Sequence, residues 1–349
     1  MSKIELLGRK LDLRSGRVDL SHGSGGRAMA RLIADIFHTA FDNDWLRAGN
    51  DQSAFDVARG RMVMTTDGYV VSPLFFPGGD IGLLAVNGTI NDIAMAGAKP
   101  LYMSASFIIE EGFPLADLQR VAQSMGAASR AGGVPIITGD TKVVERGKAD
   151  GLFISTACVG VAPEGVELSG DKARPGDVIL LSGSIGDHGV AVMSRRQNLS
   201  FDTDVRSDTA ALHELVAEMM SAGGSAIRAM RDPTRGGLAA TLNEIAHQSR
   251  VGARIDETAI PVKQQVAAAC ELLGLDPLNV ANEGKLVAIV APEAAEKTLA
   301  AMRAHPLGAD AARIGEIVAD DCCFVQMTTG FGGARIVDWL SGEQLPRIC

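Results

Sequence analysis

Residues 114–142, PLADLQRVAQSMGAASRAGGVPIITGDTK, combine a helix pattern, a strand pattern and an acidic motif. Residues 114–131 are expected to form a helix, with Pro114 near the start and Gly132-Gly133 just past the end. The apolar run 134–138 is typical of a buried strand. Thr138-Gly139-Asp140-Thr141-Lys142 should then form a loop that brings together an acid, a hydroxyl and a cation. Loops that follow strands often carry functional sites.

The same alternation extends to both sides of this stretch. Toward the N-terminus we expect strands at 62–66 and 101–109 and a helix at 81–96, and directly after the stretch a strand at 152–161. Beyond it, strands are expected at 178–182, 286–290 and 312–318, and helices at 212–220, 237–248 and 292–305. Residues 163–177 are rich in Pro, Gly and charge, which indicates a domain boundary.

The predicted organisation has four parts. A variable N-terminal extension, to which we assign no function, covers residues 1–20. It is followed by domains at 21–165 and 166–338, and by a tail at 339–349 that lacks periodicity and is expected to be mobile. A length of 349 residues also favours more than one domain.

Composition excludes several function classes. The net charge of -9 and the aromatic content of 4% argue against nucleic-acid binding, which needs clustered cations and stacking side chains. No apolar run is long enough to span a membrane, and the first residues lack a secretory apolar region. The five cysteines are scattered and include no C-x-x-C pair, which argues against a disulfide framework or a zinc site. We therefore expect a cytoplasmic protein.

Acidic residues recur in otherwise apolar or glycine-rich sequence. Asp51, Asp67, Asp92, Asp140 and Asp232 each stand at the end of a strand-like run or beside a helix start. Any one of them could be a helix cap or a turn residue. Together they suit a site for Mg²⁺ and a nucleoside triphosphate. Asp232 in particular leads into a helix that it could cap.

Three further features have more than one interpretation. The Gly-rich loop 21–26, which includes Gly25 and Gly26, could bind phosphates through its N–H groups at a helix start, or could be a flexible turn. It is no P-loop, because Arg27-Ala28 replaces the required Lys-Ser/Thr. Glu283 precedes a predicted strand and is either catalytic or a solvated surface residue. Lys142 either contacts a phosphate or is an exposed loop lysine.

Cys349 is the last residue of the sequence. It does not form a prenylation box, which needs three residues after the cysteine. A thiol on a mobile tail could be loaded by another enzyme and then delivered to an internal site. It could also be an accidental terminal residue, and the tail alone does not decide between the two.

These motifs occur together in the order seen in one family. The chain closely resembles the HypE family of hydrogenase maturation factors, in the superfamily of aminoimidazole ribonucleotide synthetase and selenophosphate synthetase. The resemblance covers essentially the whole chain. The matching sequences are His22-Gly23-Ser24-Gly25-Gly26, Thr66-Asp67, Phe76-Pro77-Gly78-Gly79, Asn91-Asp92-Ile93-Ala94, Gly139-Asp140-Thr141-Lys142-Val143, Gly186-Asp187-His188-Gly189, Arg231-Asp232-Pro233-Thr234-Arg235-Gly236-Gly237, Asn282-Glu283-Gly284-Lys285 and the family-specific ending Pro346-Arg347-Ile348-Cys349.

The resemblance implies an α+β, two-domain PurM-like fold in which the N-terminal domain pairs its sheet with that of a second copy. It also implies an ATP-dependent carbamoyl dehydratase. A carbamoyltransferase, HypF, would load the Cys349 thiol. ATP would then drive conversion of the S-carboxamide to a thiocyanate, whose nitrile passes to iron on a HypC–HypD complex as a cyanide ligand for a [NiFe] hydrogenase.

Residue roles follow from the same resemblance. Asp51, Asp92 and Asp232 would hold Mg²⁺. Lys142 would support the transition state and Glu283 would take the amide proton. The residues expected to line the nucleotide site are Asp67, Asn91, Gly139, Asp140, Thr141, Gly25 and Gly26.

Two rival functions are weaker. A selenophosphate synthetase usually carries Cys or selenocysteine near the Gly-rich loop, and here no Cys precedes Cys158. A carrier that only presents Cys349 would explain the tail but not the acidic motifs. ATP turnover on loaded protein separates the carrier from the enzyme.

Overall fold

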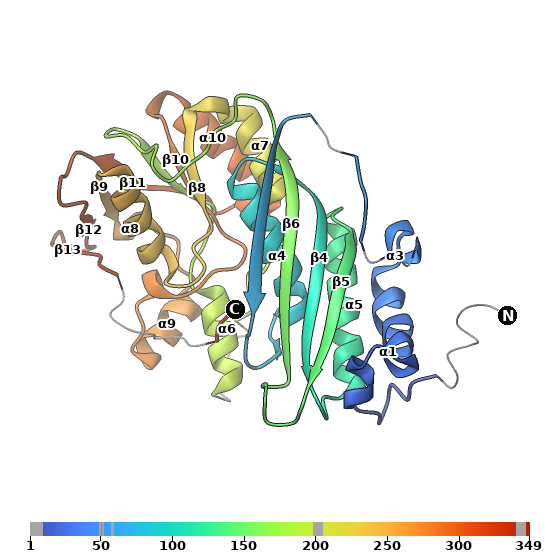
Figure 1. Cartoon of the computed structure of the whole chain (residues 1–349). Coiled ribbons are helices and arrows are strands. Elements are labelled where there is room, and N and C mark those ends of the chain that lie inside the picture. Colours follow the sequence, from blue (N-terminus) through green and yellow to red (C-terminus); the bar gives the residue numbers. More distant parts are fainter. Residues whose placement is uncertain (1–9, 49, 51, 57–58, 198–204, 340–346) are drawn as a thin grey trace.

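The computed structural model describes residues 10–48, 50, 52–56, 59–197, 205–339 and 347–349. Two β-sheets with flanking helices define an N-terminal and a C-terminal domain, which lie side by side (Figure 1). The N-terminal sheet has the order β1-β6-β4-β5, formed by Arg61–Tyr69, Leu152–Ala162, Lys99–Glu110 and Ile136–Val144. Strand β6 pairs antiparallel with β1 and β4, whereas β4 and β5 are parallel.

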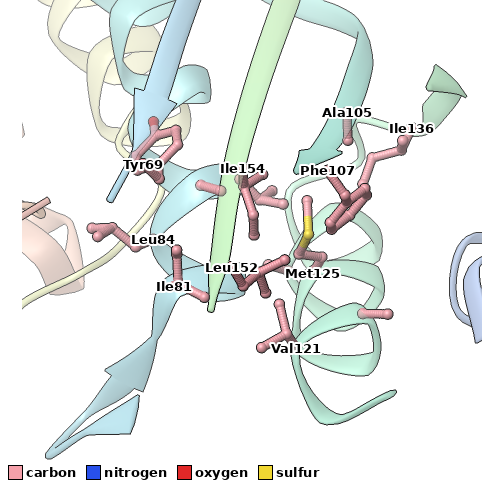
Figure 2. Close-up of a cluster of buried hydrophobic side chains, with 14 of the residues drawn as sticks. Tyr69, Ile81, Leu84, Ala105, Phe107, Val121, Met125, Ile136, Leu152 and Ile154 are labelled. Carbon is pink, nitrogen blue, oxygen red and sulfur yellow. The ribbon is translucent and has the colours of Figure 1, made fainter. Parts of the chain in front are cut away.

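One face of this sheet is covered by α4 (Ile81–Met95) and α5 (Leu115–Ala131). Side chains from both helices and from all four strands form a buried core, part of which is drawn in Figure 2. The strands alternate accordingly. In β1, for example, Tyr69 is buried whereas Met64 on the opposite face is 72% exposed. The face away from the helices is therefore open in the single chain.

The prediction of a loop at 138–142 was wrong. These residues belong to β5, which continues to Val144 because every position from Thr138 onward pairs with β4. A Cβ on Gly139 would lie 2.2 Å from the Ala105 carbonyl oxygen of that neighbouring strand, so only glycine fits there. Glycine within a strand often marks such a close approach. Asp140 and Lys142 are consequently held on a rigid strand.

Short helical segments lie beyond the β5 edge. The Gly-rich sequence forms the turn η2 (Leu20–Gly23) and leads into α1 (Arg27–Leu32), η3 (Ile33–His38) and α2 (Thr39–Phe41), followed by α3 (Asp44–Ala48). Phe37 and Phe41 pack on Phe107 of β4, with ring centroids 4.5 and 6.4 Å away. These contacts attach the helical segments to the sheet.

The C-terminal sheet has the order β13-β12-β9-β11-β7-β10-β8. Its strands are β7 (Val178–Leu181), β8 (Ile227–Arg231), β9 (Gly252–Asp256), β10 (Val287–Val290), β11 (Ala312–Val318), β12 (Val325–Thr328) and β13 (Ala334–Ile336). Strands β7 and β10 are buried along their whole length, as expected for strands covered on both faces. The hairpin β2 (Phe75–Phe76) and β3 (Gly79–Asp80) belongs to the N-terminal domain.

Helices cover both faces of the C-terminal sheet. On one side α8 (Gly237–Ser249) packs against Ile179 and Leu181, and on the other α7 (His213–Gly223) and α10 (Pro292–Ala304) pack against Val178 and Leu180. Helices α6 (Asp187–Arg196) and α9 (Gln264–Leu273) share a separate apolar cluster. The end of α4 joins the α7–α10 cluster and thereby connects the domains.

The two-domain α+β PurM-like fold is confirmed. One local expectation was wrong, because Asp232 does not cap α8. That helix begins at Gly237, and the residue at its N-cap position is Gly236, which has no side chain to offer. Among the described residues, no helix is both long and apolar enough to cross a membrane.

Candidate active site

Four of the predicted acidic residues meet where the two domains face each other. Asp67 lies in β1 and Asp92 in α4, whereas Asp232 directly follows β8 and Glu283 precedes β10. The negative charges of Asp232, Asp67 and Asp92 each help to raise the pKa of Glu283. Side chains from four segments in both domains thus form one acidic cluster.

Asp92 and Asp232 show the effect of this crowding. The Thr65 hydroxyl donates a 2.7 Å hydrogen bond to Asp92, yet burial and the nearby Asp67 raise the pKa of the Asp92 carboxyl. Burial raises the pKa of Asp232 to about 7, with Asp92 and Asp67 adding to the shift. A bound cation would relieve this repulsion between carboxylates.

Glu283 is the most deeply buried member of the cluster, with 3% of its surface exposed. Burial, followed by the charges of Asp232 and Asp208, raises its pKa well above the ordinary value. Its backbone is held by Asp208, which accepts a 3.1 Å hydrogen bond from the Glu283 N–H. Its Oε1 atom has no hydrogen-bond partner among the described residues. Glu283 therefore presents a free, high-pKa carboxyl oxygen, as a general base requires.

The terminal segment, residues 347–349, is docked between the domains beside this cluster. The Val70 and Ser72 N–H groups, just past β1, donate 3.1 Å hydrogen bonds to the carbonyl oxygens of Cys349 and Arg347, respectively. Ile348 is buried in the N-terminal core. Figure 1 shows the C-terminus next to the end of β1 and α6.

The thiol of Cys349 lies within electrostatic reach of the cluster. Burial and then the Glu283 carboxylate raise the pKa of this thiol, and the Arg235 guanidinium partly opposes them. Asp67 and Asp232 act in the same direction as Glu283. The docked sulfur is thus kept protonated, and it lies within electrostatic range of the residue predicted to be the base.

The other predicted residues gather at the β5 edge. The Lys142 ammonium contacts the Asp140 carboxylate at 2.6 Å, and this hydrogen-bonded cation lowers the pKa of Asp140. Both side chains are more than half exposed. The Gly-rich turn packs directly on this strand, since a Cβ on Gly23 would lie 2.8 Å from the Val143 nitrogen.

A cavity of about 220 Å³ opens between β5 and the first helices. Its lining is mostly apolar and includes Phe37, Phe41 and Phe107, together with the polar residues Asp140 and Thr141. Gly25 and Gly26 leave open space, because a Cβ built on either meets no atom within 4 Å. An apolar lining with a few polar groups suits a nucleotide base or another flat ligand.

The structure does not bring Lys142 to Cys349 within one chain. Strands β6 and β4 lie between β1 and β5, so the two sheet edges are about 14 Å apart. The predicted site is therefore divided into an acidic half with the thiol and a half with the Gly-rich turn and Lys142.

The carboxylates of the acidic cluster fit a metal ion that also binds phosphate and water better than a metal ion held by protein ligands alone. Among the described residues, no three His, Cys, Asp or Glu side chains are grouped closely enough to hold a metal. Mg²⁺ commonly takes one or two carboxylates and completes its shell with phosphates and water. The mutually repelling Asp92 and Asp232 fit that pattern. Asp51 lies outside the described residues, and its metal role stays a prediction.

Asn91 has protein partners for its whole side-chain amide. Its Nδ2 donates to the carbonyls of Ala210 and Glu283, at 3.0 and 3.3 Å, and its Oδ1 accepts from the Leu212 N–H at 2.8 Å. These bonds join α4 to the C-terminal domain. The nucleotide role expected for Asn91 stays a prediction.

Sequence reasoning missed several residues that shape the acidic half. Arg235, His188, Arg196 and Asp208 all act on the thiol, on the terminal segment or on Glu283. His188 and Arg235 stand inside motifs quoted above, but their spacing alone gives no reason to assign them a role.

Comparison with known proteins identifies the family to which this fold belongs. The AIR synthase related N-terminal domain matches residues 49–162, and the AIR synthase related C-terminal domain matches residues 174–327. The chain is thus an AIR synthase related protein. It is 78% identical to the carbamoyl dehydratase HypE of Rhizobium leguminosarum bv. viciae, over 98% of this chain and 97% of that protein. The chain belongs to the HypE family.

Solved structures of HypE proteins are similar to this chain in sequence and in fold. A HypE crystallised in complex with ATP has 51% identity and a TM-score of 0.91, covering 95% of this chain and 99% of that one. A HypE in a HypE–HypF complex has 50% identity and a TM-score of 0.78, over 88% of this chain and 99% of that one.

Proposed function

We propose that this chain is an ATP-dependent carbamoyl dehydratase that acts on a carboxamide carried by its own Cys349. The observation that supports the proposal is the docked terminal segment, whose Cys349 thiol feels the charge of Glu283. The names and the ATP-bound structure of close relatives support both the reaction class and the nucleotide.

The reaction needs a better leaving group than an amide oxygen offers. The carboxamide oxygen on Cys349 attacks the γ-phosphorus of ATP, which forms an O–P bond and releases ADP. Loss of inorganic phosphate then breaks the C–O bond. The carboxamide nitrogen gives up both of its protons over the two steps, which leaves S–C≡N on the cysteine. Phosphoryl transfer of this kind depends mainly on positioning and charge neutralisation.

The residues divide these tasks. Glu283 takes a proton from the carboxamide nitrogen, because its Oε1 is unpartnered in the described structure and its pKa is raised. Asp92 and Asp232, with Asp51, would hold Mg²⁺, which supplies neutralisation of phosphate charge when bound. Lys142 supports the charge of the transferring group. Asp67, Asn91, Gly139, Asp140, Thr141, Gly25 and Gly26 line the nucleotide site.

The terminal segment must leave its docked position for loading. The docked thiol is partly buried and its raised pKa makes it a poor nucleophile, so the carbamoyl group is transferred by HypF to an undocked segment. The complex of a 50% identical HypE with HypF supports this partner. The nitrile then passes to iron on a HypC–HypD complex and becomes a hydrogenase cyanide ligand. A reduced thiol and ATP fit a cytoplasmic setting.

A second copy completes the site by bringing its Lys142 to the acidic half. Within one chain Lys142 lies across the sheet from Cys349. The open face of the sheet exposes Met62, Met64 and Ile108, at 41%, 72% and 42%, and such an apolar face suits burial in a homodimer. Met64→Lys should shift the protein from dimer to monomer in light scattering. A dimer unchanged by this substitution would argue against this interface.

Mass spectrometry tests the reaction itself. Protein carbamoylated by HypF is incubated with ATP and Mg²⁺, and the peptide that ends at Cys349 is weighed before and after. Amide-to-nitrile conversion should remove about 18 Da and release phosphate in equal amount. Cys349→Ser should release none, while it still binds nucleotide. Phosphate release without the mass change would contradict the proposal, and no release at all would favour the carrier function.

A further inference from the structure

The carbonyl oxygen of Ile348 accepts a hydrogen bond from a buried side chain. His188, at the start of α6, is completely buried, and its Nε2 lies 2.8 Å from that oxygen. Because a carbonyl only accepts, the Nε2 atom must carry the proton. The imidazole therefore holds the residue immediately before the reacting cysteine.

The other ring nitrogen is fixed by a hydroxyl. The His188 Nδ1 lies 2.8 Å from the Ser207 Oγ, which in turn contacts the Thr209 hydroxyl at 2.6 Å and accepts from the Thr209 N–H at 3.1 Å. A neutral ring can then accept from Ser207 at Nδ1 while it donates to Ile348 at Nε2. Burial lowers the pKa of His188, which favours this neutral form, although Asp208 and the Ile348 carbonyl oppose the shift. The ring also packs edge-on against Phe76, with centroids 5.4 Å apart.

The same loop reaches the proposed base. Ser207 is followed by Asp208, which accepts from the Glu283 N–H and forms a 3.3 Å ion pair with Lys285. On its other side the Ser207 N–H donates to the Pro77 carbonyl at 2.9 Å. One loop, residues 207–209, therefore contacts both His188, which holds the terminal segment, and Glu283, which is proposed to act on the carbamoyl group.

We propose that His188 is a positioning residue that holds Cys349 in register with Glu283, through its hydrogen bond to the Ile348 carbonyl and the support of the Ser207 hydroxyl. It acts on the peptide backbone and does not touch the carbamoyl group. The inference deepens the proposed function, but docking can be measured without any turnover. The terminal segment is already docked when Cys349 carries only a thiol.

The test is alkylation of the full-length protein by iodoacetamide, followed at individual cysteines by mass spectrometry. Cys322 is exposed and serves as an internal reference in every sample. His188→Ala removes the imidazole donor from the Ile348 carbonyl, and the rate at Cys349 should rise by about 5- to 100-fold relative to Cys322. His188→Gln can place an amide N–H near the Nε2 position and should restore much of the protection. His305→Gln, at the end of α10, is a histidine control and should change nothing.

A second pair of variants protects the test against misfolding at His188. A Cβ on Gly78 would lie 2.7 Å from the Ser207 nitrogen, so Gly78→Ala should displace the loop and also expose Cys349. Gly78 has a φ of +91°, and the substitution strains the backbone as well. Gly165→Ala has a similar strain, at φ +79°, but meets no atom within 4 Å, and should leave Cys349 protected. Equal exposure in the two glycine variants would overturn the role of the loop.

The kinetic readout separates this inference from the proposed function. On carbamoylated protein, His188→Ala should lower kcat for phosphate release and leave the KM for ATP unchanged, because docking is intramolecular. Unchanged alkylation of Cys349 in folded His188→Ala, or equal exposure in the Ala and Gln variants, overturns the inference. If the wild type releases no phosphate, the proposed function fails, but the alkylation result still decides the role of His188.

Discussion

At the β1 edge of the N-terminal sheet, burial and neighbouring carboxylates raise the pKa values of Asp92 and Glu283, whereas at the β5 edge Lys142 lowers the pKa of Asp140. Asp92 and Glu283 are packed between the domains, and Glu283 keeps an unpartnered oxygen in the described structure. Asp140 and Lys142 are exposed and form an ion pair with each other. The fold thus holds the buried carboxyl groups in an electrostatically unfavourable state, while the exposed pair at the β5 edge is already satisfied within the chain.

The largest effect is expected at the acidic edge. Glu283→Gln keeps the shape of the side chain but removes the base, so phosphate release from carbamoylated protein should fall by about 100-fold or more. Alkylation of Cys349 should stay slow, because the docking contacts are intact. A normal rate with Glu283→Gln would remove this residue from the mechanism.

The next prediction tests whether Lys142 at the β5 edge of one chain acts on Cys349 at the β1 edge of a second chain. Lys142→Ala and Cys349→Ser should each be nearly inactive, the former by about 100-fold. If a second copy supplies Lys142, re-associated mixtures of the two variants contain heterodimers with one complete site. Equal mixing should then recover about a quarter of wild-type phosphate release. Mixtures that remain inactive despite proven subunit exchange would place Lys142 and Cys349 in the same chain's reaction.

A smaller effect concerns stability and pH. The Asp232 carboxyl has its pKa raised in the folded state, to about 7, so the folded form holds its proton longer than the unfolded form. Its contribution to the free energy of unfolding therefore falls as pH rises from about 4 to about 7. Asp232→Asn removes this loss and should stabilise the protein by at most about 4 kcal/mol at pH 8, and by only about 1 kcal/mol at pH 4.5. Urea unfolding at both pH values measures the difference, and an equal gain at both would contradict it.

The smallest effect is the contribution of Asp140 to stability, which changes with pH in the opposite direction to that of Asp232. The pKa of Asp140 is lowered by Lys142, so its contribution is present at neutral pH and is lost as the pH falls through the folded value. Because both side chains are exposed, Asp140→Asn should cost less than about 1 kcal/mol at pH 8. A stabilisation by Asp140→Asn in the same urea assay would show that the two edges do not differ electrostatically.

Local sequence signals predicted much of the fold. The helix expected at 114–131 is present as α5, and the strand at 312–318 as β11. Strands β9 and β12 escaped prediction because their pairing joins segments far apart in the chain. Strand β13 escaped because its three residues are all exposed and give no apolar pattern. The end of β5 was also misjudged, since Gly139 indicates a turn locally and only its approach to Ala105 shows why a strand needs it.

The candidate site was predictable in its residues but not in its geometry. Asp67, Asp92, Asp232 and Glu283 attracted attention because acids in apolar sequence need a reason to be there. That they meet, and that Lys142 lies across the sheet from them, depends on strand order, which no local pattern encodes. Whether the domains divide at the predicted residue 165 stays a prediction.

The docking of residues 347–349 through main-chain carbonyls has a practical consequence for handling the protein. These hydrogen bonds fix the position of the main chain, and the buried Ile348 side chain adds to the placement of the neighbouring cysteine. An affinity tag fused after Cys349 would add backbone directly next to this docked segment and its hydrogen bond to Val70. Purification tags therefore belong at the N-terminus, away from the docked segment.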